Sequence, residues 1–185
     1  MDQAALQTAI HTGDWPQAEA ILGPVAQSPA APASLVYNYG KVLIELGRSR
    51  EAVEALSRVV SADPTHANAW FELGRAALLH EDFLSALNGF ERAVALDPAD
   101  ADARRNLGRV ALRIGEWALA RAAWAPFEGH DAEADIALYR IACETRDESA
   151  EARRADLMTR YPDRAAVISA LVRVSKGAIP LDLRP

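Results

Sequence analysis

Residues 67–100 read ANAWFELGRAALLHEDFLSALNGFERAVALDPAD, and their apolar side chains recur at helical spacing in two runs of about 14 residues. His80-Glu81-Asp82 separates the two runs, and a turn this short forces two helices into an antiparallel pair. Pro98 ends the second run, because proline cannot continue the hydrogen-bond ladder of a helix. These residues therefore predict a helical hairpin.

The same pattern recurs along the chain with a period of 34 residues. Three kinds of position align at this offset: the glycines Gly40, Gly74 and Gly108, the alanines Ala52, Ala86 and Ala120, and the large apolar residues Leu56, Phe90 and Trp124. We expect the small residues where the two helices of a pair cross, and the large ones in the gap to the next repeat. The blocks 33–66, 67–100 and 101–134 are therefore predicted to be three copies of one hairpin.

The middle block resembles the tetratricopeptide repeat (TPR). It carries the family pattern W-x2-L-G…A-x3-F…P as Trp70, Leu73, Gly74, Ala77, Ala86, Phe90 and Pro98. The first block has Val36, Tyr39 and Leu56 where the family prefers Trp, Leu and Phe, and the third has Arg104 and Ala132 in the Trp and Pro places. The resemblance implies an all-α fold, a right-handed solenoid of antiparallel helix pairs with a C-terminal capping helix.

The segments on either side of the three blocks resemble decayed repeats. Residues 1–32 predict a degenerate N-terminal hairpin, whose register is lost at Gly23-Pro24 and in the insertion 28–32. Residues 135–176 predict a degenerate repeat, with helices over 131–145 and 148–160, and a capping helix over 163–176 that covers the last apolar face. Residues 177–185 show no helical period and are expected to form a tail.

Composition limits the classes of protein to which the chain can belong. It has 185 residues, half of them apolar, with a net charge of −6, which is typical of a globular protein and disfavours nucleic-acid binding. No run of 18 apolar residues is present, and residues 1–5 lack the features of a signal peptide, so we expect a cytoplasmic protein without a membrane span. An excess of arginine over lysine, 18 to 2, favours a bacterial source.

The sequence carries no recognisable catalytic constellation. The four histidines are scattered without metal-ligand spacing, and there is no phosphate loop and no nucleophile elbow. Cys143, the single cysteine, lies within an apolar helical run and is interpreted as a buried small residue. We therefore expect a protein that is not an enzyme and needs no cofactor or metal.

Stacked helix pairs form a curved array with a concave surface, and in the family that this chain resembles the first helix of each pair lines that surface. Candidate partner-binding residues are first-helix side chains that the repeat does not need for its own packing. They are Tyr37, Asn38, Lys41, Asn68, Phe71, Arg75, Arg105, Asn106, Arg109 and Arg113. Lys41, Arg75 and Arg109 recur at the period of 34 and are expected to form a basic ladder.

Two interpretations of these cations remain open. They suit a peptide that bears carboxylates, since Arg binds carboxylate in a bidentate manner and Asn binds peptide backbone. They also suit pairing within the protein at helical spacing, as Lys41 with Glu45, Arg75 with Glu72, and Arg105 with Asp102. The chaperone-binding carboxylate clamp of the family is not expected, because Tyr37, Glu72 and Asp102 stand at its positions.

The predicted function is a non-catalytic adaptor or scaffold that binds a protein or peptide segment in the concave groove, and an acidic or carboxylate-bearing segment is one candidate partner. The alternative is a homo-oligomeric scaffold in which an end or the tail of one molecule docks onto the next, with Ile179-Pro180-Leu181-Asp182-Leu183 as an extended ligand.

Overall fold

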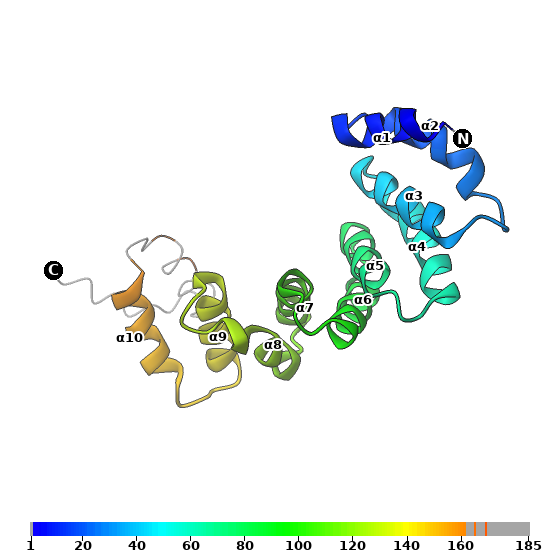
Figure 1. The fold of residues 1–185 in the computed structure, drawn as a ribbon. Helices are drawn as coiled ribbons and strands as arrows, with labels where there is room; N and C mark the ends of the chain where they lie inside the picture. The colour runs from blue at the N-terminus through cyan, green and yellow to red at the C-terminus, as the bar shows by residue number, and fades with distance from the viewer. Residues whose placement is uncertain (1, 162–164, 166–168, 170–185) are drawn as a thin grey trace. The chain divides into compact units, whose positions relative to one another are not determined.

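The computed structural model describes residues 2–161, 165 and 169, and within this part of the chain it contains helices and no strand (Figure 1). The elements are α1 (Gln3–Thr12), α2 (Trp15–Ala26), α3 (Ala33–Glu45), α4 (Ser49–Ala62), α5 (Ala67–Leu79), α6 (Phe83–Leu96), α7 (Ala101–Ile114), α8 (Trp117–Trp124), the 3-10 helix η1 (Ala125–Phe127), α9 (Ala132–Glu144) and α10 (Ala150–Arg160). The predicted all-α fold is confirmed. The capping helix expected over 163–176 and the tail expected over 177–185 lie outside the described residues, apart from residues 165 and 169.

The chain divides into two compact units, residues 1–107 and 108–185, so that α7 begins in the first and ends in the second. In the first unit the pairs α1–α2, α3–α4 and α5–α6 pack in series, with α2 against α3 and α4 against α5. In the second unit α8 packs against α9, and α9 against α10. No helix in the described part is both long and apolar enough to cross a bilayer.

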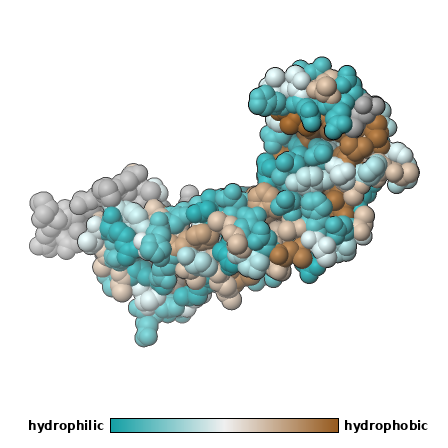
Figure 2. Space-filling view, in the orientation of Figure 1, coloured by the Kyte–Doolittle hydropathy of each residue, from teal (hydrophilic) through white to brown (hydrophobic). Residues whose placement is uncertain are grey.

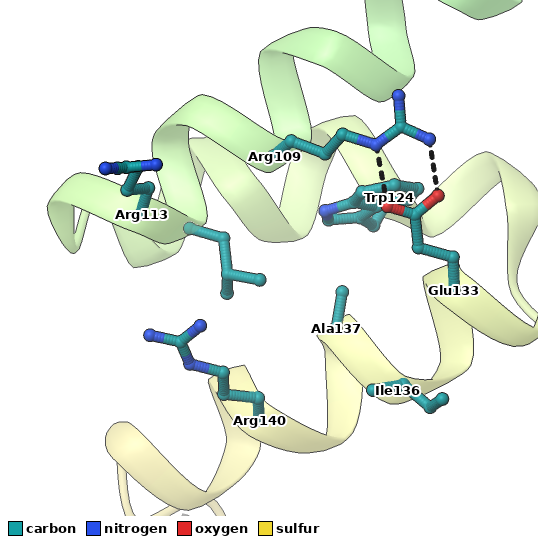
Figure 3. A pocket seen from close by; sticks show the side chains of 8 residues that line it. Arg109, Arg113, Trp124, Glu133, Ile136, Ala137 and Arg140 are labelled. Carbon is teal, nitrogen blue, oxygen red and sulfur yellow. Dashed lines mark hydrogen bonds and ion pairs between the residues drawn. The ribbon is translucent and has the colours of Figure 1, made fainter. Parts of the chain in front are cut away.

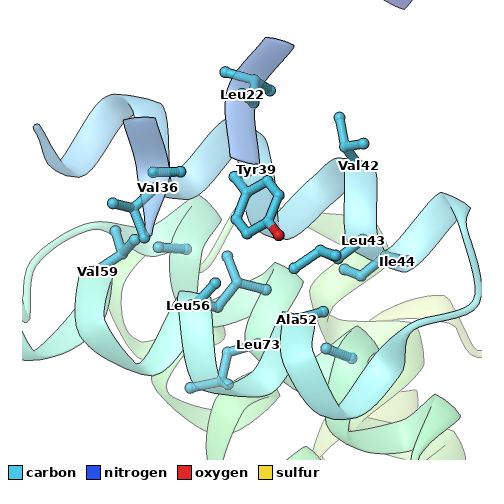
Figure 4. Close-up of a cluster of buried hydrophobic side chains, with 14 of the residues drawn as sticks. Leu22, Val36, Tyr39, Val42, Leu43, Ile44, Ala52, Leu56, Val59 and Leu73 are labelled. Atoms are coloured by element: carbon cyan, nitrogen blue, oxygen red, sulfur yellow. The ribbon is translucent and has the colours of Figure 1, made fainter. Parts of the chain in front are cut away.

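The core of the first unit is continuous from α1 to α5. Side chains from α2, α3 and α4 meet between the helices, with Leu22, Leu43 and Leu56 completely buried and Val36 and Val59 nearly so (Figure 4). The same cluster reaches Leu73 and Ala76 on α5. Each helix thus buries one apolar face against its neighbours, as its sequence period predicts.

The close crossings fall where the sequence placed glycine. A Cβ atom at Gly40 would lie 2.7 Å from Leu56, one at Gly74 2.9 Å from Phe90, and one at Gly108 2.5 Å from Trp124. Any larger side chain would displace the residue opposite it. The large residue of each repeat therefore lies against the glycine of its own hairpin. We had predicted from the sequence that it fills the gap to the next repeat.

The turns within the hairpins need a left-handed residue at one equivalent position. Gly47 has φ 72° and Gly115 has φ 85°, and Glu81 adopts φ 60° between them, one period from each. Glycine occupies this region without steric cost, whereas a residue with a Cβ is strained there. The interruption of the glycine pattern at Glu81 is thus a change of residue and not of conformation.

Two arginines, one before and one within α4, bind the N-terminal hairpin to the first repeat. Arg48 contacts Glu19 of α2 at 3.1 Å. Arg58 donates hydrogen bonds to the carbonyls of Ala26 and Ser28, at 2.9 and 2.8 Å, and so holds the start of the insertion 28–32. Helix α2 continues through Pro24 to Ala26.

In the second unit a buried carboxylate ties the end of α10 to α9. Asp135, 6% exposed, accepts hydrogen bonds from the Tyr161 hydroxyl at 2.5 Å, the Gly129 backbone at 2.8 Å and Arg160 at 3.3 Å. Burial of Tyr161, together with this hydrogen bond to Asp135, raises the pKa of its phenol above the usual value. The helices expected over 131–145 and 148–160 are observed as α9 and α10.

Candidate partner-binding grooves

The candidate residues are positioned by the first helix of each pair. On α3 the side chains of Val36, Tyr39 and Leu43 are buried, which leaves Asn38 and Lys41 on the opposite face. The same helical period makes Asn68 exposed on α5 and leaves Phe71 and Arg75 half-buried there.

A groove of about 370 Å³ lies beside α3 and α5 in the first unit; we call it the α3–α5 groove. Its lining comes from α1, α2, α3 and α5: Ile10, Trp15, Asn38, Lys41, Val42, Glu45, Glu72 and Arg75. The sequence predicted Asn38, Lys41 and Arg75 as site residues, and the structure brings these three together. Ile10 and Trp15 add apolar surface from the N-terminal hairpin (Figure 2 shows brown, apolar atoms between this hairpin and α3).

Arg75 is held by two carboxylates. Its Nη1 donates to Glu72 Oε2 at 2.7 Å, and its Nη2 lies 3.4 Å from Glu45 Oε1. The Glu72 side chain is only 7% exposed, so the guanidinium compensates a carboxylate that has been removed from water. Arg75 is therefore part of the fold as well as part of the groove.

Lys41 interacts with an aromatic ring. Its Nζ lies 5.6 Å from the ring centroid of Tyr37, which in turn packs 5.1 Å from the ring of His66. Among the described residues Lys41 has no ion pair, and Glu45, its predicted partner, contacts Arg75 instead. Burial raises the pKa of Tyr37, and the charge of Glu72 raises it further, while Arg75 lowers it.

A second groove of about 430 Å³, the α5–α7 groove, also belongs to the first unit. It is lined by Phe71, Arg75, Leu78, Leu79, Asp102 and Asn106. Phe71 packs edge-on against Phe90 at 5.8 Å, while Leu79 is 57% exposed. The predicted contact of Arg105 with Asp102 forms at 3.7 Å. Asn68 and Tyr37 line neither groove.

The second unit holds a groove of about 410 Å³ between the end of α7 and α9, the α7–α9 groove (Figure 3). Its lining is Arg109, Leu112, Arg113, Trp124, Glu133, Ile136, Ala137 and Arg140. Arg109 binds Glu133 through two hydrogen bonds, from Nε at 2.6 Å and from Nη2 at 2.5 Å. This fork-to-carboxylate geometry is the one that arginine uses to bind acidic ligands.

The structure divides the predicted cations between two grooves. Lys41 and Arg75 share one groove, and Arg109 and Arg113 share another in the second unit. A ladder of Lys41, Arg75 and Arg109 on one surface stays a prediction.

Sequence analysis missed several lining residues outside the first helices. They are Ile10, Trp15, Ile136, Ala137 and Arg140 of the degenerate flanks, and Glu133 at the end of the third block. The repeat period could have identified Arg140, because it stands 34 residues after Asn106, which was predicted as a site residue.

Chemically reactive groups do not gather in these grooves. No cluster of three or more potential metal ligands occurs among the described residues. Cys143 is half-buried and not fully buried as expected, and it packs near Tyr139. Burial and the contact with Cys143 raise the pKa of Tyr139 to about 12. The arrangement therefore offers ion pairing, hydrogen bonding and apolar contact.

Comparison with known proteins agrees with this architecture. Residues 37–87 and 80–125 match the family model of the tetratricopeptide repeat. No curated protein matches the sequence.

Solved structures share the all-α solenoid fold, and three of them illustrate the range. The crystal structure of MamA protein has a TM-score of 0.69 and 19% identity, covering 98% of this chain and 94% of that one. MamA 41-end from Desulfovibrio magneticus RS-1 has a TM-score of 0.71 and 22% identity, covering 84% and 90%. A tetratricopeptide repeat protein from Parabacteroides merdae ATCC 43184 has a TM-score of 0.74 and 14% identity, covering 93% and 70%. At these identities the likeness concerns the fold.

Proposed function

We propose that this chain, which belongs to the tetratricopeptide-repeat family, is a non-catalytic adaptor that binds a segment of another protein along the first helices of its pairs. The family and its fold are those of protein-interaction scaffolds. The finer proposal, that the partner is a peptide segment held in a groove, rests on the geometry of the α3–α5 groove.

The observation that carries the proposal is the mixture of side chains in that groove. Ile10 and Trp15 supply apolar surface, and Asn38 and Lys41 supply polar donors beside it. Apolar anchors next to hydrogen-bond donors are how binding hot spots are built. The size of the groove, about 370 Å³, falls within the range of about 300–1,000 Å³ that is typical of ligand sites.

The charge of the partner segment follows from which cations are already paired. Arg75 is bound to Glu72 and Glu45, so Lys41 is the cation of this groove that can meet a ligand carboxylate without breaking an ion pair. An acidic or carboxylate-bearing segment would therefore contact Lys41 first, with Asn38 one turn away to bind its backbone.

Site-specific crosslinking tests the proposal. A photoreactive benzoylphenylalanine replaces Asn38 in the groove or, as control, Glu91, an exposed residue of the second helix α6. After irradiation in cells, we expect adducts with another protein at position 38, reduced at least tenfold when Lys41→Glu is added, and none of these at position 91. The same adducts from both positions, or no effect of Lys41→Glu, would contradict the proposal.

The alternative predicted from sequence, self-assembly through the tail, concerns residues outside the described part of the chain. Light scattering of the full chain and of a version ending at Lys176 distinguishes it, since equal masses would dismiss the tail as an assembly element. Cytoplasmic location and bacterial source stay predictions.

A further inference from the structure

We propose that the face formed by the second helices α4 and α6, which we call the α4–α6 face, is the contact surface of a symmetric dimer of this chain. The contact uses neither the first-helix grooves nor the tail, so it goes beyond the proposed function and does not depend on it. The observation that carries it is Leu84, an exposed leucine that stands beside an uncharged hollow.

Leu84 is the most exposed of the large apolar side chains that the structure describes, at 73%. It lies in the first turn of α6, at a position that is Arg50 one period earlier and Ala118 one period later. The repeat therefore needs no large apolar residue here for its own packing. Covering such a side chain with a second surface is favourable, because it removes apolar area from water.

The hollow beside Leu84 lies between α4 and α6 and has a volume of about 320 Å³. Leu84 belongs to its lining, together with Val53, Ser57, Leu73, Ser85 and Asn88. A protruding leucine and a hollow on the same face complement each other across a two-fold axis. In such an isologous contact, Leu84 of each copy enters the hollow of the other.

Charge complementarity identifies the occupant as a second copy. The chain has a net charge of −6, so two copies repel each other where acids meet. The lining of the hollow contains no charged residue, so a second copy can cover it without bringing like charges together. Beyond the lining, α4 carries the cation Arg50 and α6 the acid Glu91, both exposed. A cation on one helix and an acid on the other can pair twice in a symmetric contact.

Helical register determines how these charges meet. Helices α4 and α6 occupy the same place in successive hairpins, so a two-fold axis lays α4 of one copy antiparallel to α6 of the other. Glu91 lies seven residues after Leu84, and Arg50 lies seven residues before Ser57, which is two helical turns in each case. When Leu84 of one copy contacts Ser57 of the other, Arg50 therefore comes to lie opposite Glu91.

Arg50 is able to form this pair. Its contact with Glu54 is 3.5 Å long, and the two side chains are 79% and 68% exposed. Such an exposed pair contributes little, so Arg50 can turn to Glu91 of the second copy while Glu54 stays solvated. The contact is small, and we expect half of the chain to be dimeric at roughly 0.1 mM and almost none of it at about 1 µM.

Sedimentation equilibrium of the full chain tests the dimer. Between about 1 µM and 1 mM we expect the average mass to rise from 20.0 kDa toward twice that value and no further, because an isologous contact closes. Leu84→Glu should abolish the rise. The matched control Leu79→Glu, at an exposed leucine of the first helix α5, should leave it unchanged. Circular dichroism at about 1 µM verifies that the helices of each variant remain.

A charge exchange tests the register. Arg50→Glu and Glu91→Arg each bring like charges together at both ends of the contact, and each should weaken dimerisation about tenfold. The double variant carries the two charges exchanged and should restore association to within about threefold of the unaltered chain. A double variant no tighter than either single one would overturn the antiparallel register. Benzoylphenylalanine at position 91 should crosslink two copies of the chain, a product that differs from the adducts expected at position 38.

Other outcomes separate this inference from the proposed function. A mass of 20.0 kDa at every concentration, a rise that Leu84→Glu leaves unchanged, or a mass that exceeds two chains would each overturn the dimer. A rise that is lost when the chain ends at Lys176, and not with Leu84→Glu, would assign assembly to the tail and also overturn it. Each of these results leaves the adaptor function standing, because the adducts at position 38 do not depend on Leu84.

Discussion

The middle hairpin, α5–α6, and the hairpin before it, α3–α4, follow one pattern but solve the same packing problem differently. At the crossing of the middle hairpin, glycine faces glycine, and a Cβ atom on Gly89 would lie 2.7 Å from the backbone nitrogen of Gly74. One period earlier the residue is Ala55, which is 6% exposed and accommodated. The large residue beside it is Phe90 in the middle hairpin and Leu56 in its neighbour, each completely buried.

The shared repeat pattern therefore determines whether a position takes a small or a large side chain. The distance between the two helices then determines which small residue, Gly or Ala, and which large residue, Phe or Leu, fits. The helices of the middle pair approach closely enough to exclude a methyl group at position 89. The Phe90 ring lies against Gly74 at this crossing, where a Cβ atom on the glycine would come within 2.9 Å of it. Substitutions at three positions of the middle hairpin, each compared with a matched position, test whether these local differences affect stability.

The largest effect is expected at Phe90. Phe90→Ala removes a completely buried ring and should lower the free energy of unfolding by about 3–5 kcal/mol. Leu56→Ala, at the equivalent position, should cost about 3 kcal/mol, because less side chain is lost. Urea denaturation followed by circular dichroism measures both.

The control for Phe90 lies on the same helix. Leu84 is 73% exposed, and Leu84→Ala should change stability by less than about 0.5 kcal/mol. If Phe90→Ala cost no more than Leu84→Ala, the ring would not support the hairpin.

At Gly89 the sign of the change in stability distinguishes the middle hairpin from the one before it. Helix propensity alone predicts that Gly89→Ala stabilises the protein by about 1 kcal/mol. The close backbone of Gly74 predicts instead a net loss of about 1–2 kcal/mol, because the helices must move apart. Ala55→Gly should cost only the propensity difference of about 1 kcal/mol. Greater stability of Gly89→Ala in thermal unfolding would show that the helices separate freely.

The smallest effect is expected at the start of the second helix. Asp82 caps α6 by accepting a hydrogen bond from the Ser85 backbone at 3.1 Å, whereas Arg48 and Glu116, one period away on either side, make no such bond. Asp82→Ala should lower the free energy of unfolding by about 1 kcal/mol at pH 7, and Glu116→Ala by less than about 0.5 kcal/mol.

The pH dependence of this effect has a definite sign. Hydrogen bonds from Ser85 hold the pKa of Asp82 below its usual value in the folded protein. Its contribution is therefore present above the unfolded pKa of about 4 and is lost as the pH falls through the lower folded pKa. The stability difference between Asp82→Ala and the unaltered chain should shrink between pH 5 and 2. A constant difference over that range would contradict an ionised cap.

The helices were predictable from sequence because each depends on local information. Apolar period, short turns and Asp-Pro pairs lie within about 34 residues of one another, and α3 to α6 begin and end inside the expected blocks. The ion pair of Arg75 with Glu72 was predictable for the same reason, since both lie on one helix turn.

The grooves were harder to predict because their contacts join different helix pairs. Glu45 reaches Arg75 from 30 residues away, and Glu133 reaches Arg109 from 24 residues away, in a segment with little repeat pattern. Such pairs depend on how one hairpin stacks on the next, which helical period does not determine. Glu81 illustrates the converse, because its left-handed backbone matches Gly47 and Gly115 although the residue type gives no such signal.

The contact between each glycine and the large residue of its own hairpin bears on how such an array evolves. Leu56, Phe90 and Trp124 each meet a glycine sixteen positions earlier in the same repeat. A substitution at this layer can be compensated inside one copy after tandem duplication, without a matching change in the adjacent copies. Individual copies are then able to drift apart in sequence, and recombination between genes can exchange one for another while this layer of the interior stays filled.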